Sequence, residues 1–215
     1  MRSLPNIIVT GTPGTGKSTH CKRLAELLPE YTYLSINQFI TDNKLQDGRD
    51  EERNSVIANE DKLVELIRPD LKKGGRIIDW HVCDIFPESL IDLVVVMRTD
   101  TTRLYDRLKE RGYTGTKFDD NMDSEIMEVI LTDAREAYAP EIVIELQSNS
   151  VENVVANSAR IVEWAKQWVI DNTREDGGSE ESESESESGS GSGSESESEG
   201  SEEEEDDEED EEDDE

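Results

Sequence analysis

Glycine, lysine and serine recur near the start of the chain at the spacing that binds phosphate groups. The run Gly11-Thr12-Pro13-Gly14-Thr15-Gly16-Lys17-Ser18-Thr19 fits the pattern G-x-x-x-x-G-K-[ST], in which backbone N–H groups surround phosphate oxygens. The Lys17 ammonium can reach the β- and γ-phosphates, and the Ser18 hydroxyl can bind Mg²⁺. The alternative is a glycine turn that carries a lysine by chance.

The residues on either side of this loop predict the strand and the helix that a phosphate-binding loop requires. Residues 5–10 form a short apolar, β-branched run, which is typical of a buried parallel strand. Apolar and charged residues are mixed in a helical pattern over residues 22–28. This context favours a working nucleotide site over a chance glycine turn.

An aspartate and a histidine follow another short apolar run. Residues 76–79 predict a strand, and Asp79 at its end could bind Mg²⁺ directly or through water. Aspartate after a strand is also a common cap or turn residue, but its pairing with the loop favours the metal role. His81 could position or activate the attacking water or the acceptor. It could equally be a packed or surface histidine, and the spacing leaves both open.

Three arginines, Arg103, Arg107 and Arg111, are spaced four residues apart and fall on one face of a predicted helix. They could form a solvated basic face, or a lid whose guanidinium groups close over phosphates. Glycines within residues 110–120 make a hinge plausible, so this segment is the predicted lid and Arg111 its best candidate.

Residues 35–58 are long and polar for a plain connection, so we expect them to receive a second substrate. Arg53 is the candidate there for binding the phosphate of a monophosphate.

Strands and helices alternate through the chain, which predicts an α/β fold with a parallel sheet covered by helices on both faces. Ligands in such sheets bind beyond the carboxyl ends of the strands, where the loop and Asp79 fall. Further strands are expected at 31–36, 93–97 and 142–146, helices at 60–73, 101–109, 123–138 and 151–171, and a polar segment at 110–120.

Composition divides the chain into a domain, 1–174, and an acidic tail, 175–215. The tail holds 24 of the 54 acidic residues and no Lys or Arg, which leaves 30 acidic against 22 basic residues in the domain. A segment of Glu, Asp, Ser and Gly has no apolar surface to bury, so we expect disorder. It is either a solubilising tail or an interaction tail for a basic partner. Two cysteines are no disulfide framework, and no apolar stretch is long enough to span a bilayer.

Five motifs occur in an order and spacing that resemble the adenylate kinase isoenzyme 6 family over residues 4–171. Beyond the loop with its preceding Thr10, they are Asp79-Trp80-His81, Asp84-Ile85-Phe86-Pro87-Glu88, Arg98-Thr99-Asp100-Thr101 and Glu110-Arg111-Gly112-Tyr113. The loop alone is shared with many ATPases. The Asp-aromatic-His triplet together with the Phe-Pro-Glu and Arg-Gly-Tyr elements is much more specific.

The resemblance implies a P-loop NTPase fold of the adenylate kinase type with a five-stranded parallel sheet. It implies Mg²⁺ bound with ATP, a Walker B role for Asp79 beside Ser18, and a role in hydrolysis for His81. Lys17, Asp79 and His81 would then be the catalytic residues. The implied ATP-binding residues are Gly14, Gly16, Lys17, Ser18, Thr19 and, in a short lid, Arg111.

The resemblance also implies nucleoside monophosphate kinase activity, ATP and AMP giving two ADP, together with ATPase activity. Its implied setting is small ribosomal subunit maturation and 18S rRNA processing, with a basic ribosomal protein of the subunit platform and the pre-40S particle as partners. One alternative is an assembly ATPase or chaperone of that protein, and a weaker one is a shikimate- or gluconate-type kinase. We expect a monomer in the nucleus and cytoplasm, without membrane contact or sequence-specific nucleic-acid binding.

Overall fold

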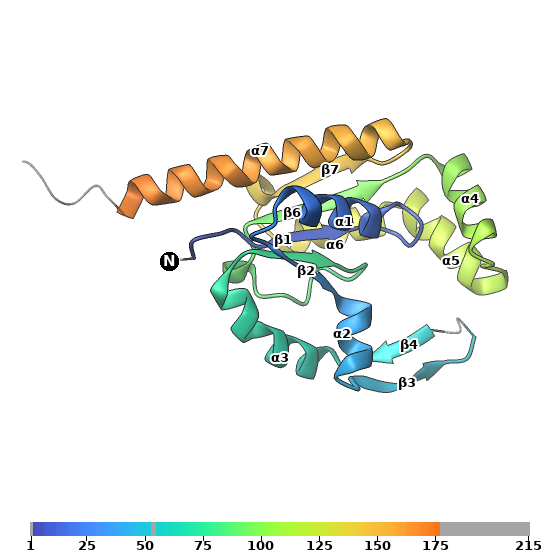
Figure 1. Ribbon diagram of the computed structural model, residues 1–215. Coiled ribbons are helices and arrows are strands. Elements are labelled where there is room, and N and C mark those ends of the chain that lie inside the picture. Colours follow the sequence, from blue (N-terminus) through green and yellow to red (C-terminus); the bar gives the residue numbers. More distant parts are fainter. Residues whose placement is uncertain (1, 53–54, 177–215) are drawn as a thin grey trace, which may run out of the picture. The chain divides into compact units, whose positions relative to one another are not determined.

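Five parallel strands form the centre of the protein, in the order β2-β5-β1-β6-β7 (Figure 1). The computed structural model describes residues 2–52 and 55–176. This sheet confirms the predicted α/β fold and its five parallel strands. The strands are β1 (Ile7–Thr10), β2 (Thr32–Ser35), β5 (Arg76–Asp79), β6 (Leu93–Arg98) and β7 (Val143–Gln147).

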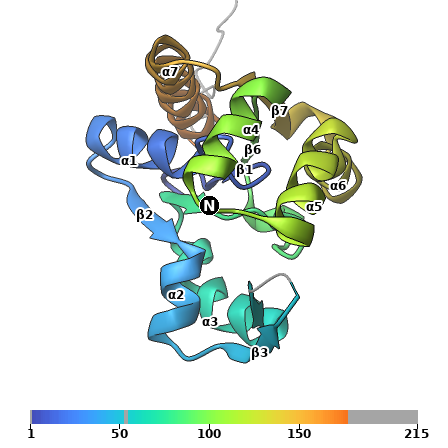
Figure 2. The same ribbon diagram turned by 90° about the vertical axis from the view of Figure 1, so that its right-hand side faces the viewer.

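Helices cover both faces of the sheet, which explains why its central strands are apolar on both sides. Helices α1 (Lys17–Leu27) and α7 (Val151–Asp176) lie on one face, and α3 (Glu60–Lys73) and α6 (Val129–Ala137) lie on the other (Figures 1 and 2). Successive residues of β1 therefore point into different cores. Ile8 packs with the α3 side, and Ile7 and Val9 pack with the α1 side.

Residues 35–58 fold into a helix and a hairpin beside the sheet. Helix α2 (Ile36–Asp42) leads to two antiparallel strands, β3 (Gln46–Asp50) and β4 (Ser55–Ala58). Leu45 anchors the start of the hairpin in the core, where it is 5% exposed. Helix α3 then begins at Glu60, and the side chain of Asn59 caps it by accepting a hydrogen bond from the Lys62 N–H.

The predicted helix at 123–138 is wrong, because the structure has two helices in this region. Helix α4 (Thr101–Glu110) is followed by α5 (Gly115–Ile126), which takes up half of the predicted polar segment 110–120, and then by α6. Glu128 separates α5 from α6 with a left-handed φ of 57°. No glycine or proline marks this break in the sequence, which is why periodicity alone joins the two helices.

Short 3₁₀ turns at Glu88–Leu90 and Pro140–Ile142 complete the connections. Helix α7 continues beyond its predicted end at 171 as far as Asp176. Residues 177–215 lie outside the described residues, so the acidic tail and the domain boundary at 174 stay predictions. None of the helices in the described ranges is both long and apolar enough to cross a membrane.

Candidate nucleotide-binding site

The loop between β1 and α1 has a backbone that only glycine adopts readily. Gly11 and Gly16 have φ angles of 134° and 96°, which are unfavourable for other residues. Space is also limited, since a Cβ atom on Gly11 would lie 2.4 Å from the Met97 carbonyl oxygen and one on Gly16 would lie 2.7 Å from Ser148 Oγ. The glycines therefore let the loop lie tightly against the ends of neighbouring strands.

The Lys17 ammonium lies over this loop. Its Nζ atom donates to the carbonyl oxygens of Gly11 at 2.7 Å and Thr12 at 3.1 Å. Burial lowers the pKa of Lys17 to about 8, with Arg111 acting in the same direction and Asp79 opposing it. The cation can thus exchange two backbone oxygens for phosphate oxygens. Ser18 and Thr19 follow in the first turn of α1 with exposed side chains.

Asp79 lies at the end of β5, in register with Val9 of β1, and is 6% exposed. Its Oδ2 atom accepts a hydrogen bond from the Tyr33 hydroxyl at 2.8 Å. Burial and this contact raise the pKa of Tyr33, so the hydroxyl keeps its proton. One carboxylate oxygen is thereby held by β2. Tyr33 has no motif of its own, and sequence reasoning missed it.

His81 lies just beyond Asp79, and its backbone is fixed to β1. The Thr10 hydroxyl donates to the His81 carbonyl oxygen at 3.2 Å, while the exposed imidazole meets the buried Trp80 ring edge-on with 5.5 Å between centroids. The protein around the ring and the Lys17 charge lower the pKa of His81 to about 4, although Asp79 opposes them. The imidazole is therefore neutral near pH 7, and its unprotonated nitrogen can accept a hydrogen bond.

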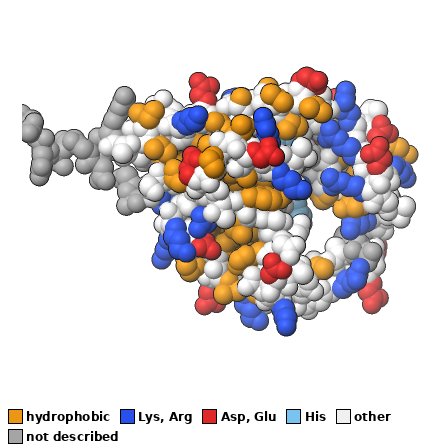
Figure 3. Space-filling model, viewed as in Figure 1, with side chains coloured by type: hydrophobic (Ala, Val, Ile, Leu, Met, Phe, Trp, Pro, Cys, Tyr) orange, Lys and Arg blue, Asp and Glu red, His pale blue; other side chains and the backbone are white. Residues whose placement is uncertain are grey.

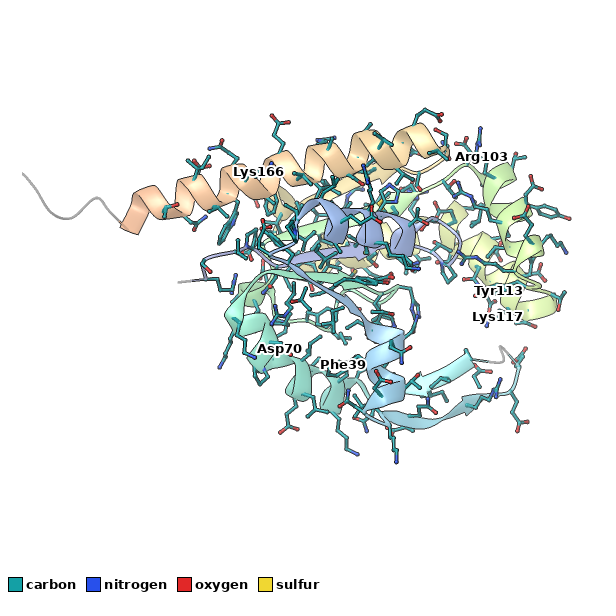
Figure 4. All side chains as sticks on the ribbon, in the orientation of Figure 1. Phe39, Asp70, Arg103, Tyr113, Lys117 and Lys166 are labelled. Carbon is teal, nitrogen blue, oxygen red and sulfur yellow. The ribbon has the colours of Figure 1, made fainter. Side chains whose placement is uncertain are left out.

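The three arginines of α4 differ in what they contact. Arg107 donates to the carbonyl oxygens of Gly14 at 3.2 Å and Ser148 at 2.9 Å, so its guanidinium holds the loop. Arg103 donates to the Asn149 carbonyl oxygen at 2.7 Å, near the start of α7 (Figure 4). Arg111 is exposed, and its positive charge contributes to the lowered pKa of Lys17. Arg53 lies outside the described residues.

A buried ion pair joins α5 to the end of β6, next to the loop. Arg98 Nε donates to Glu125 Oε1 at 2.8 Å, and the Thr99 N–H donates to the same oxygen at 3.0 Å. The Thr99 hydroxyl in turn donates to Asn149 Oδ1 at 2.8 Å. Sequence reasoning found the Arg98–Thr101 motif but missed Glu125 and Asn149, because their roles depend on contacts across the fold.

The space-filling view shows the molecule hollowed between the β3–β4 hairpin and helices α4 and α5 (Figure 3). Lys and Arg side chains gather on the α4–α5 side of this hollow, where Tyr113 and Lys117 lie across from Phe39 of α2 (Figure 4). The two sides meet where Thr116 Oγ1 donates to Glu52 Oε1 at 3.4 Å. The predicted acceptor segment, 35–58, and the predicted lid, 110–120, thus border one space.

The donor set suits Mg²⁺ that is shared with a nucleotide. Within residues 2–52 and 55–176, no group of three or more His, Cys, Asp or Glu side chains could hold a metal ion. Magnesium usually takes one or two carboxylates together with substrate phosphates and waters. Asp79 and the Ser18 hydroxyl fit that pattern, whereas an ion held by protein ligands alone does not.

Comparison with known proteins identifies the family. Residues 7–128 match a family model described as an AAA domain. An adenylate kinase isoenzyme 6 homolog of Saccharomyces cerevisiae is 53% identical over 165 residues, which cover 77% of this chain and 84% of the relative. An adenylate kinase isoenzyme 6 homolog of Schizosaccharomyces pombe is 46% identical over 167 residues, which cover 78% of this chain and 95% of the relative. The chain belongs to the adenylate kinase isoenzyme 6 family.

This adenylate kinase isoenzyme 6 family member shares its fold with a solved shikimate kinase from Bacteroides thetaiotaomicron. The TM-score is 0.53 at 17% identity, over 76% of this chain and 99% of the other. That likeness concerns the fold alone and does not favour a shikimate-type substrate. Family and fold together make the chain a kinase-like nucleotide-binding protein, and they confirm the resemblance seen in its motifs.

Proposed function

We propose that this protein transfers the γ-phosphoryl group of ATP to AMP, forming two ADP, and that it also hydrolyses ATP. The observation that carries the proposal is the hollow between the hairpin and helices α4 and α5, because it offers room for an acceptor beside a phosphate-binding loop. The names of the relatives support adenylate chemistry. A metabolite kinase remains less favoured, since only a fold likeness speaks for it.

In this mechanism, the loop and Lys17 hold the β- and γ-phosphates of ATP. The Lys17 ammonium leaves the carbonyls of Gly11 and Thr12 to bind phosphate oxygens. Asp79 and Ser18 would hold Mg²⁺, which supplies charge neutralisation at the phosphates. Arg111, whose charge lowers the pKa of Lys17, would add to the positive environment of the phosphates. Catalysis is then mainly a matter of positioning and charge.

The acceptor decides between kinase and ATPase activity. When AMP lies in the hollow, its phosphate can attack in line; when AMP is absent, water can take that place. The neutral imidazole of His81 is suited to orient the water by accepting a hydrogen bond from it. His81 is accordingly assigned to hydrolysis more than to nucleotide binding.

We place this activity in small ribosomal subunit maturation and 18S rRNA processing, in the nucleus and cytoplasm. The support is the family and the charge: the chain has 54 acidic against 22 basic residues, which favours a strongly basic partner. The partner proposed is a ribosomal protein of the subunit platform within the pre-40S particle. In the alternative, the protein is an assembly ATPase or chaperone: ATP hydrolysis changes its affinity for that ribosomal protein, and the kinase reaction is incidental.

One set of assays tests these proposals. ADP formation by the purified protein is measured with ATP alone, with ATP and AMP, and with ATP and a basic platform ribosomal protein. A large increase with AMP supports the kinase, and an effect mainly of the ribosomal protein supports the assembly ATPase. Absence of turnover in every mixture would refute both. Imaging of the tagged protein checks its location.

A further inference from the structure

We propose that His20 and Asn157 orient the phosphate-binding loop from its outer side, which makes His20 a positioning residue for bound phosphate. The inference rests on the proposed function only in requiring that the loop bind a nucleotide. His20 lies in α1, one turn beyond the loop, and Asn157 lies in α7, the helix packed beside α1.

Continuous hydrogen bonds join these two side chains to the loop and to β7. His20 is fully buried, and its Nδ1 atom lies 3.0 Å from the Gly16 carbonyl oxygen, which also accepts the backbone N–H groups of Thr19 at 3.1 Å and His20 at 3.2 Å. Its Nε2 atom lies 3.3 Å from Asn157 Nδ2, which also donates to the Gln147 carbonyl oxygen at 2.8 Å. Gly16 is thereby linked through His20 and Asn157 to the end of the last strand.

The partners also determine the protonation state of the imidazole. Burial lowers the pKa of His20, so the ring is neutral and has one donor and one acceptor. Nδ1 must donate, because the Gly16 oxygen can only accept, and Nε2 then accepts from the Asn157 amide. The two N–H groups of that amide are both used, one on His20 and one on Gln147. Both ring nitrogens of His20 and the side-chain nitrogen of Asn157 thus have hydrogen-bond partners.

Peptide geometry connects this contact to phosphate binding. In a trans peptide the C=O of one residue and the N–H of the next point in opposite directions. A donor that fixes the Gly16 carbonyl outside the loop therefore fixes the Lys17 N–H toward the phosphate side. Gly16, at φ 96°, has the backbone freedom of a glycine, so the imidazole adds a side-chain restraint to the two backbone hydrogen bonds that its carbonyl accepts at the start of α1.

Arg107 holds a second carbonyl of the loop. Its guanidinium donates to the Gly14 carbonyl oxygen at 3.2 Å, and this restrains the peptide whose N–H, that of Thr15, donates to the Thr12 carbonyl oxygen at 3.2 Å. It is also bound to the Ser148 carbonyl oxygen, one residue beyond Gln147. Two glycine carbonyls of the loop thus accept hydrogen bonds from side chains that are themselves bound at the end of β7. Arg107 connects Gly14 to Ser148, and His20 connects Gly16 to Gln147 through Asn157.

The test compares His20→Leu, Asn157→Ala and the double variant in the full-length protein. Each is titrated with MgADP by calorimetry, and the amide proton of Lys17 is followed by ¹⁵N NMR. We expect affinity to fall about tenfold in each variant, the size of one lost hydrogen bond to an oriented group. The double variant should be no weaker than His20→Leu, because both act through one contact. The ADP-induced shift of the Lys17 amide should shrink in all three.

Asn172→Ala is the matched control, since Asn172 lies on the same helix and donates only to the Trp168 carbonyl oxygen among the described residues. It should bind ADP like the wild type. Wild-type affinity and an unchanged Lys17 amide shift in Asn157→Ala would overturn the inference, even if His20→Leu fails to fold. If the wild type binds ADP but does not phosphorylate AMP, only the proposed function fails. If the wild type does not bind ADP, both fail.

Discussion

Tyr33→Phe removes a single hydroxyl group that holds the carboxylate of Asp79. The hydroxyl donates to Oδ2 at 2.8 Å, and Asp79 is 6% exposed, so little water can replace the lost partner. Hydrogen bonds to charged groups contribute roughly 1.5–3 kcal/mol. We therefore expect the free energy of unfolding to fall by about 2 kcal/mol without nucleotide.

The Tyr33→Phe substitution should also lower the affinity of the ADP-bound protein for Mg²⁺. Removing a partner that orients a metal-binding group typically lowers metal affinity roughly 10- to 100-fold. The assay is a Mg²⁺ titration at fixed ADP, followed by fluorescence of a labelled nucleotide. ADP binding in the presence of a chelator should be unchanged, because the Tyr33 hydroxyl donates to Asp79 and, among the residues that the structure describes, no hydrogen bond joins it to the loop.

Tyr31→Phe is the control for this experiment. Tyr31 is 7% exposed, and its buried hydroxyl has no hydrogen-bond partner among the residues that the structure describes. Its removal should leave Mg²⁺ dependence unchanged and should not destabilise the protein. The reasoning is refuted if Tyr33→Phe needs no more Mg²⁺ than Tyr31→Phe does.

Three further predictions concern the loop and its neighbours. Bound phosphate raises the pKa of Lys17 above its free value of about 8, so calorimetry should show ADP affinity falling above pH 8, by at most about tenfold per pH unit; a flat profile to pH 10 contradicts this. His81→Gly should lower ATP hydrolysis in a phosphate-release assay while ATP affinity stays near that of the wild type, unlike Lys17→Ala. Gly11→Ala should cost roughly 1–3 kcal/mol of backbone strain and more for the Met97 clash, measured by urea denaturation. Gly112→Ala, where nothing lies within 4 Å of the new Cβ, should show the backbone cost alone.

The sequence predicts those parts of the site that are contiguous in the chain. The loop is a continuous motif, and Asp79 follows a readable strand, so the parallel sheet brings both to the same edge. Tyr33, Glu125 and Asn157 have no such signal. Each is identified only by a partner 46, 27 or 137 residues away, and a single sequence contains no record of such pairings.

The fold, like the site, depends in part on contacts between distant residues that local sequence patterns do not predict. Alternating apolar runs predict five parallel strands, but they do not determine that β1 lies between β5 and β6. Local patterns also fail where long-range contacts decide a helix end. Helix α5 ends where Glu125 is buried against Arg98, and Glu128 then takes a left-handed backbone. No local residue preference requires a break at that point.

The position of the loop within the fold has a consequence for the protein during its synthesis. The nucleotide loop is complete by Thr19, yet its carbonyls are held by Arg107 and, through His20, by Asn157. We therefore expect a ribosome-bound chain to gain tight affinity for ATP only after α7 has emerged from the exit tunnel. A nascent chain stopped before residue 150 should bind nucleotide poorly, although it already contains every residue of the motif.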